Sequence, residues 1–193
     1  MALIWPNAIH EKTNEENHSF KCGIAGWFFE GPGNGLDWFV VDEEFFAYSR
    51  DLLLSVDTIL FDRVTYQYMA GYWPSAPSDE IADKMNNLLK IVFSTTLENA
   101  DWNNSRLVQG NVVEEVSTLK QQPGKDMAVL GSLILASSFL QSGLVDEYRV
   151  IVSPVLIGGG RPLFKGSTEM LKLRLLGTKT FASGVVMLTY RRE

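Results

Sequence analysis

The segment over residues 129–164 constrains the fold more than any other part of the chain. An apolar strand-like run, 127–130, turns through Gly131 and Ser132 into an apolar helical run, and a second strand then ends in three glycines. A strand that turns through glycine into a helix directs free backbone N–H groups, and the positive end of the helix dipole, towards the space above the turn. The segment therefore predicts an α/β unit whose turn either binds an anion or simply connects two elements.

Short apolar runs alternate with helical runs along the rest of the chain. Two strand-like runs, 171–179 and 184–190, are joined by a short turn and predict a terminal hairpin. Alternating strands and helices indicate right-handed crossovers and a mostly parallel sheet covered on both faces. The expected fold class is therefore α/β, with a mostly parallel central sheet flanked by helices and a C-terminal antiparallel hairpin. The other expected strands are 58–61, 90–94, 106–108, 127–130 and 147–153, and the expected helices are 42–55, 63–70, 78–87, 112–120 and 133–140.

Length and composition point to one globular domain. The 193 residues are enough for a sizeable core. We expect a polar N-terminal extension over residues 1–19, followed by a single domain over residues 20–193. The net charge is −6, and Lys and Arg are scattered rather than gathered in a basic stripe. These features argue against a nucleic-acid partner.

The number of cysteines, the positions of the histidines and the length of the apolar runs exclude further classes of protein and of site. The one cysteine, Cys22, rules out an internal disulfide, and both histidines, His10 and His18, lie in the polar N-terminal stretch, so we expect no metal site. No apolar run reaches the length of a membrane-spanning helix, and the first residues lack the basic start and long apolar core of a secretory signal. We therefore expect no membrane partner and a cytoplasmic location.

Residues 20–36 are rich in glycine and aromatic side chains, and we expect a loop there. Trp27, Phe28 and Phe29 lie within this stretch. Because loops rarely leave several large rings in water, these rings either pack on the body of the domain or line a pocket, and the sequence does not decide between the two. Residues 17–22 are also more polar than a buried strand of a parallel sheet should be.

Ligands of open parallel sheets bind at the carboxyl ends of the strands. The relevant loops of this chain follow Phe61, Ser94, Leu130 and the strand over residues 147–153. Their motifs resemble those of small bacterial proteins built like the C-terminal reductase domain of the bifunctional riboflavin-biosynthesis deaminase/reductase, which share the dihydrofolate reductase fold. The resemblance covers residues 23–190, with the motifs LFDRVTY (60–66), GYWP (71–74), IVFSTTLENADW (91–102), VLGSLILASSFLQSGLVDEYRV (129–150) and SPVLIGGGRPLF (153–164).

The resemblance implies an NADPH-dependent reductase with a dihydrofolate reductase-like fold. The turn with Arg63 and Thr65 would hold cofactor phosphates, the turn at Gly131 the pyrophosphate, and the turn after Ser94 the adenosine 2′-phosphate. A guanidinium fork and a helix start both suit phosphate oxygens. The structural alternatives are a surface ion pair for Arg63 and a helix-start hydroxyl for Thr65. The implied cofactor-binding residues are Asp62, Arg63, Thr65, Ser94, Thr95, Gly131, Ser132, Leu133, Gly158 and Gly159.

The implied reaction is hydride transfer to a C=N or C=O group of a flat heterocyclic substrate, of the riboflavin-precursor or pterin type. The candidates for substrate contact are the large or acidic side chains Trp27, Trp38, Glu44 and Trp73, together with Asp37. Each has a structural alternative: the loop candidates can simply end the glycine-rich stretch, Glu44 can be a first-turn helix charge, and Trp73 can cover the end of the sheet. No residue stands out as a general acid.

Three positions depart from the family pattern where an anionic cofactor would bind. Ala25 stands where the family carries an acidic residue, Asp62 where it carries glycine, and Thr95 where it often carries Arg or Lys. One repulsive charge beside a phosphate costs on the order of a few kcal/mol, or a factor of about a hundred in affinity. The alternative to the reductase is therefore a homologue that keeps the fold with weakened or lost NADPH binding, and is non-catalytic or takes another ligand.

Two apolar elements near the C-terminus are candidates for an interface. The helix over residues 133–140 and the strand over residues 147–157 are apolar enough to supply a dimer surface. Members of the family are commonly dimers, so the resemblance implies a homodimer. A homodimer is compatible with both the reductase and its alternative.

Overall fold

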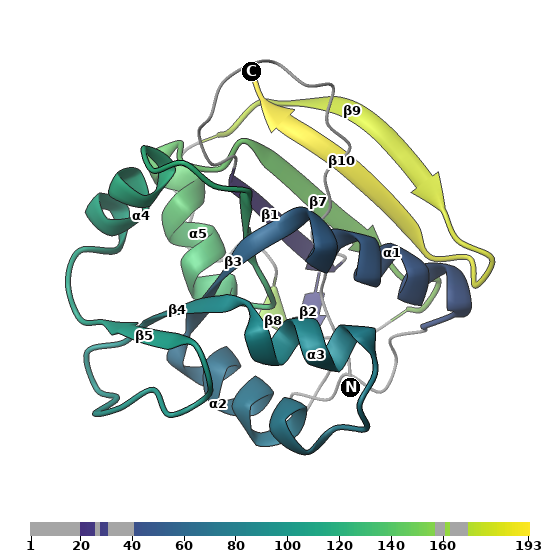
Figure 1. Cartoon of the computed structure of the whole chain (residues 1–193). Coiled ribbons are helices and arrows are strands. Elements are labelled where there is room, and N and C mark those ends of the chain that lie inside the picture. The colour runs from purple at the N-terminus through teal and green to yellow at the C-terminus, as the bar shows by residue number, and fades with distance from the viewer. Residues whose placement is uncertain (1–19, 26–27, 31–40, 157–160, 163–169) are drawn as a thin grey trace.

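The computed structural model describes residues 20–25, 28–30, 41–156, 161–162 and 170–193 of the chain. The centre of the molecule is an eight-stranded sheet with the order β5-β4-β3-β6-β1-β7-β10-β9 (Figure 1). Its strands are β1 (Phe20–Ala25), β3 (Val56–Asp62), β4 (Leu89–Phe93), β5 (Ser105–Val108), β6 (Asp126–Val129), β7 (Glu147–Val152), β9 (Leu173–Thr180) and β10 (Val186–Arg192). β2 (Phe28–Glu30) pairs separately with β8 (Arg161–Pro162).

The strands from β5 to β7 in this order are parallel, and β10 and β9 complete the sheet as an antiparallel hairpin. The predicted fold class is confirmed, because the sheet is mostly parallel and ends in the C-terminal hairpin. All parallel strands therefore present their carboxyl ends at one edge, which is the edge where ligands of such sheets bind.

Helices cover both faces of the sheet (Figure 1). One buried cluster joins α1, α2 and α3 to the sheet, and a second joins α4 and α5 to it. In β3, Ile59 and Phe61 belong to the first cluster and Leu60 to the second, because successive side chains of a strand point to opposite faces. In the part of the chain that the structure describes, no helix is both long and apolar enough to cross a membrane. The helices are α1 (Glu43–Ser55), α2 (Arg63–Tyr72), α3 (Glu80–Asn87), α4 (Val112–Lys120) and α5 (Leu133–Ser142), and the 3₁₀ turn η2 (Trp73–Ser75) follows α2.

The helices begin at polar side chains that accept hydrogen bonds from their first turns. Asp42 accepts from the Phe45 N–H at 2.7 Å at the start of α1, as the sequence predicts. Such caps satisfy backbone donors that have no partner within the helix. The caps of the other helices are Asp62, Asp79, Asn111 and Ser132.

The prediction of a loop over residues 20–36 is wrong for β1 and β2. β1 lies inside the sheet and pairs in parallel with β6 on one side and with β7 on the other. Two ladders of backbone hydrogen bonds hold this strand, and this pairing outweighs the polar, glycine-rich composition that argues against a buried strand.

α5 and β7 use most of their described apolar side chains inside the chain's own core. Leu135, Ala136 and Phe139 of α5 and Ile151 of β7 are all buried, whereas Ile134 is 61 % exposed. Of the surface that the sequence suggests for dimer contact, α5 and most of β7 are therefore largely buried within one chain, whereas Val152, Val155 and Leu156 at the end of the predicted strand are exposed.

Candidate functional site

Three of the four loops that the sequence predicts as ligand-binding start side by side at one edge of the sheet. Asp62 of β3 pairs with Phe93 of β4, and Leu60 of β3 pairs with Val129 of β6. The loops after β3, β4 and β6 therefore begin next to each other, and two of them lead directly into α2 and α5 (Figure 1). This arrangement brings two helix starts, with their partial positive charge, to neighbouring positions.

Asp62 holds the start of α2 and connects it to the start of α5. Its Oδ1 accepts from the Thr65 N–H at 2.8 Å, and its Oδ2 accepts from the hydroxyl of Ser132. The Ser132 Oγ in turn accepts from the Leu135 N–H at 3.3 Å and caps α5. Asp62 is 9 % exposed. The carboxylate that the sequence suggests would repel a phosphate thus uses both oxygens inside the protein.

A second contact joins the same two loops. Thr65 Oγ1 donates to the Gly131 carbonyl at 3.3 Å. Gly131 has a φ of +69°, and a Cβ at this position would lie 3.3 Å from Thr65 Cγ2. A left-handed backbone angle and a close neighbour both favour glycine. The contact with α2 is therefore enough to explain a glycine at this turn.

Arg63, the first residue of α2, is exposed. Its Nη1 donates to Gln67 Oε1 at 2.8 Å, one turn further along the helix. Arg63 forms no ion pair with any residue that the structure describes. The described residues therefore do not support a surface ion pair as the role of Arg63. An exposed guanidinium at a helix start is well suited to bidentate contact with a phosphate. Leu133 occupies the same first position in α5.

The turn after β4 is held by its own hydroxyl. Ser94 Oγ accepts from the N–H groups of Thr96 at 3.1 Å and Leu97 at 2.9 Å. Thr95 is exposed. The sequence from Ser94 to Leu97 holds no Lys or Arg, so this turn presents hydroxyl groups to a ligand but no cation.

The far end of α2 borders an aromatic cleft of about 310 Å³. Trp73 lines the cleft with Tyr72, whose ring meets the Trp73 ring edge-on at 5.1 Å between centroids. The Trp73 Nε1 donates to Met69 Sδ at 3.3 Å, so α2 itself fixes the indole. Trp73, predicted as a substrate contact, therefore lies at a site with room for a ring. The other lining residues are Val41, Phe45, Phe46, Ser49, Ala76, Pro77, Asp79 and Ile81.

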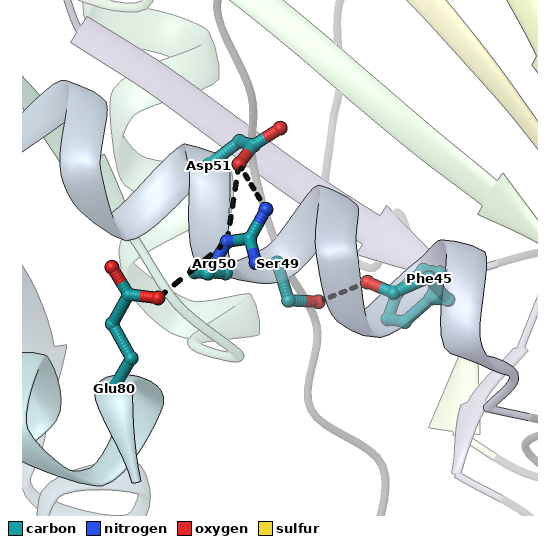
Figure 2. Close-up of polar contacts among 5 residues, drawn as sticks. All are labelled: Phe45, Ser49, Arg50, Asp51 and Glu80. Carbon is teal, nitrogen blue, oxygen red and sulfur yellow. Dashed lines mark hydrogen bonds and ion pairs between the residues drawn. The ribbon is translucent and has the colours of Figure 1, made fainter.

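α1 and α3 form a polar region beside this cleft (Figure 2). Arg50 Nη2 lies 3.2 Å from Asp51 Oδ1, and Arg50 Nε lies 3.7 Å from Glu80 Oε2. Ser49 donates to the Phe45 carbonyl at 2.7 Å, so its hydroxyl is satisfied within the helix. A second hollow of about 370 Å³ adjoins the cleft and is lined by Glu43, Phe46, Ala47, Arg50, Asp79, Glu80 and Ile81.

Glu44, also predicted as a substrate contact, binds the turn of the terminal hairpin. Its Oε2 accepts from the Ala182 N–H at 2.8 Å, and Asp42 Oδ2 accepts from the Ser183 N–H at 2.7 Å. Hydrogen bonding from Ser183, and then from the Phe45 N–H, lowers the pKa of Asp42 below its usual value. Two carboxylates thus connect the start of α1 to the turn between β9 and β10.

Several predicted site residues lie outside the described part of the chain. They are Trp27, Asp37 and Trp38 on the substrate side and Gly158 and Gly159 on the cofactor side. Ala25, a departure from the family pattern, is the last residue of β1 and pairs with Ile151 of β7. Its backbone therefore reaches the same edge of the sheet.

Two residues of the cleft and one residue at the end of β7 are not predicted as site residues from the sequence. Phe46 and Tyr72 line the cleft and are 50 % and 40 % exposed. Both are large aromatic residues on the outward side of a helix. A sequence pattern that identifies only the buried positions of a helix does not select them. Ser153, which follows β7, has a buried hydroxyl with no hydrogen-bond partner among the described residues. Such a group is uncommon. Ser153 opens the predicted motif SPVLIGGGRPLF, but the sequence does not assign a ligand contact to it.

The strongest pKa shifts among the described residues belong to the scaffold. Burial lowers the pKa of Lys90 to about 8, and its ammonium donates to three backbone carbonyls. Burial also raises the pKa of Tyr48 and lowers that of Arg149, which donates to the Tyr48 hydroxyl at 3.3 Å. None of the three groups lines the cleft or the helix starts. Among the described residues, no group of three or more His, Cys, Asp or Glu side chains could hold a metal ion.

Comparison with known sequences identifies a family and two relatives. Residues 33–187 match the family described as the RibD C-terminal domain. The chain is 35 % identical over 167 residues to the uncharacterized protein YyaP of Bacillus subtilis (strain 168), a match that covers 84 % of this chain and 87 % of that protein. It is 30 % identical over 165 residues to the uncharacterized protein YwjB of the same organism, covering 84 % of each chain.

Solved structures share the fold. A putative riboflavin biosynthesis protein from Shewanella sp. PV-4 superposes with a TM-score of 0.72 and 21 % identity, covering 91 % of this chain and 99 % of that one. A dihydrofolate reductase from Enterococcus faecalis, in complex with NADP(H), superposes with a TM-score of 0.60 and 10 % identity, covering 91 % of this chain and 96 % of that one. The predicted dihydrofolate reductase-like fold is confirmed.

Proposed function

The chain belongs to the RibD C-terminal domain family, and we propose on this basis that it is an NADPH-dependent reductase of a flat heterocyclic substrate, of the riboflavin-precursor or pterin type. Membership of this family supports a reductase-type function. The observation that carries the proposal is the double connection from Asp62 to Ser132 and from Thr65 to Gly131. It holds two helix starts, each with N–H groups suited to a phosphate, side by side at the binding edge.

NADPH would extend from these helix starts towards the aromatic cleft. Arg63 and the first N–H groups of α2 suit its phosphate oxygens, and the turn at Gly131 suits its pyrophosphate. α2 has ten residues, so it spans about 15 Å between the two regions. Bound there, the cofactor would supply a hydride to the carbon of a C=N or C=O group, while a proton from water or a side chain goes to the nitrogen or oxygen.

Titration with NADPH tests this proposal. Nicotinamide fluorescence is followed as purified protein is added, and we expect saturable binding. Arg63→Gln should weaken binding by about tenfold, because it removes a charged phosphate ligand. Arg174→Gln is the matched control, because Arg174 is an exposed arginine on the distant hairpin. Failure to bind NADPH at millimolar concentration would contradict the proposal.

Asp62 favours a second candidate function, in which the fold is kept but NADPH binding is weak or lost and another ligand is taken. Its carboxylate lies at both helix starts, and the turn after β4 supplies no cation. Asp62→Asn removes the charge and keeps an acceptor for the Thr65 N–H, whereas Asp62→Gly removes the cap as well. If the charge limits binding, Asp62→Asn should raise NADPH affinity tenfold or more. An unchanged affinity would contradict this second candidate.

We also propose that the protein is a cytoplasmic homodimer. β9 is the edge strand of the sheet, and its neighbouring Leu175 and Leu176 are 51 % and 48 % exposed. Strand edges with apolar side chains pair readily with a second chain. Light scattering at micromolar concentration is expected to give a dimer, and Leu176→Lys to shift it towards monomer. A monomeric wild-type protein would contradict the proposal.

A further inference from the structure

The charged side chains around the aromatic cleft are mostly negative. Asp79 lines the cleft, and Glu43 and Glu80 line the hollow that adjoins it. Among the described lining residues, the one cation is Arg50. Arg50 is already paired, because it contacts both Asp51 and Glu80 (Figure 2). A ligand that enters this region therefore meets carboxylates and no unpaired guanidinium.

The interior of the cleft is apolar, and its polar side chains are engaged. Ser49 donates to the Phe45 carbonyl at 2.7 Å, and Asp79 Oδ1 accepts from the Ala82 N–H at 2.7 Å. The volume of about 310 Å³ lies at the lower end of the usual range for small-molecule sites, about 300–1,000 Å³. Such a space suits one planar ring system packed between aromatic walls, rather than a ring with a long polar extension.

We propose that this cleft binds an uncharged or cationic planar heterocycle and rejects one that carries a phosphate or carboxylate. The inference rests on the proposed reductase function and narrows its substrate to an unphosphorylated ring of the pterin type, in preference to a phosphorylated riboflavin precursor. An anionic group beside Asp79 and Glu80 would lose water without gaining a counter-charge. Discrimination of this kind comes from repulsion as much as from attraction.

Two ligands with the same ring test the inference. Pterin and pterin-6-carboxylate differ by one carboxylate, and both are fluorescent, so their binding is measured directly on the intact chain without NADPH. We expect pterin to bind at least tenfold more tightly than its carboxylate. Equal binding, tighter binding of the carboxylate, or no binding of either compound would overturn the inference.

Paired variants test whether the charges of this region cause the discrimination. In the double variant Asp51→Asn/Glu80→Gln, Arg50 loses both carboxylate counter-charges, and its charge becomes available to an anionic ligand. We expect this variant to bind pterin-6-carboxylate about tenfold more tightly than the wild-type chain and pterin equally well. Glu114→Gln removes an exposed carboxylate from α4, on the other face of the sheet, and should change neither affinity. An unchanged affinity of the double variant for the carboxylate would overturn the inference.

The variant Phe46→Ala tests whether the ligand binds in the cleft. Because Phe46 is 50 % exposed, its loss should leave the unfolding temperature nearly unchanged but weaken pterin binding about tenfold. Unweakened pterin binding would show that the ring binds elsewhere, and would overturn the inference.

Titration with NADPH alone distinguishes failure of this inference from failure of the proposed reductase function. If the chain binds NADPH but not pterin, the proposed reductase function stands and the inferred preference for an uncharged or cationic ring is overturned. If it binds pterin selectively but not NADPH, the reductase function is overturned and the inferred preference is supported.

Discussion

The two ends of α2 are built in different ways. At its start, directed hydrogen bonds connect Asp62 and Thr65 to Ser132 and Gly131 at the start of α5. At its end, Trp73 is buried among side chains of α1, α2 and α3 in one apolar cluster. Hydrogen bonds fix distance and direction, whereas packing fixes shape. The start is therefore suited to a ligand recognised by charge and the end to a ligand recognised by the fit of a ring.

Trp73→Ala tests the packed end and should have the largest effect. Trp73 is 5 % exposed, and the loss of burial together with the cavity left behind should lower the free energy of unfolding by about 3–5 kcal/mol. Tyr72→Ala is the matched control, because Tyr72 is 40 % exposed and should cost about 1 kcal/mol or less. Urea denaturation measures both. Similar losses in the two variants would show that this end is not organised around Trp73.

Lys90 belongs to a network of hydrogen bonds that reaches the backbone of Trp73, and its titration tests this network. Asn86 donates from Nδ2 to the Trp73 carbonyl at 3.0 Å, and the Asn86 carbonyl accepts from Lys90 Nζ at 3.1 Å. Burial lowers the pKa of Lys90 from 10.5 to about 8. Between these two pH values, the unfolded chain binds a proton that the folded chain has released. Stability should therefore rise with pH in this window, with a slope of about 1.4 kcal/mol per pH unit, while the full cost of burying the charge is present below pH 8.

Urea denaturation at several pH values between 8 and 10 measures this slope. Lys90→Met, which keeps the length of the side chain without the charge, should reduce it by the amount that Lys90 contributes. Lys84→Met on α3 is the control, since Lys84 is only half-buried, and its variant should keep the wild-type slope. A wild-type slope that survives in Lys90→Met would mean that another group titrates in this window.

The start of α2 could be predicted from the sequence better than its end. Asp62, Ser132 and the glycine between strand and helix are local signals at helix starts. The inward direction of the Asp62 carboxylate could not be predicted, because its partner Ser132 lies 70 positions away. The cleft has no local signal either, because it gathers side chains from three helices. The strand β1 was missed for the same reason, since its partners β6 and β7 are distant in the sequence.

One local rule also predicted too short a helix. Gly71 and Pro74 suggest that the helix ends near residue 70, but α2 continues through Gly71 to Tyr72 and passes into η2. A glycine inside a helix costs only about 1 kcal/mol, and the burial of Met69 and Trp73 at this end outweighs that cost. Tertiary packing, rather than intrinsic propensity, therefore sets the end of α2.

A double-mutant cycle on Asp62 and Ser132 tests the connected start. Asp62→Ala and Ser132→Ala each remove a helix cap and their shared hydrogen bond, and each should cost about 1–3 kcal/mol of unfolding free energy. The double variant should cost less than the sum, with a coupling of about 0.5–3 kcal/mol. Asp79→Ala combined with Ser132→Ala is the control, because Asp79 caps α3 and should be additive with Ser132. Additivity between Asp62 and Ser132 would show that the two helix starts are independent.

Substitutions of two glycines, one near each end of α2, should give the smallest changes in stability, but changes of opposite sign. Gly131→Ala places a Cβ at a φ of +69° and 3.3 Å from Thr65 Cγ2, and should lower stability by about 1–2 kcal/mol. Gly71→Ala adds a Cβ in the last turn of α2, where no described atom outside the adjoining helix backbone lies within 4 Å of it, and should raise stability by about 0.5–1 kcal/mol. Thermal unfolding of the two variants should therefore show shifts of opposite sign. A neutral Gly131→Ala would mean that the turn relaxes around the new side chain, and that the contact with Thr65 does not fix the start of α2.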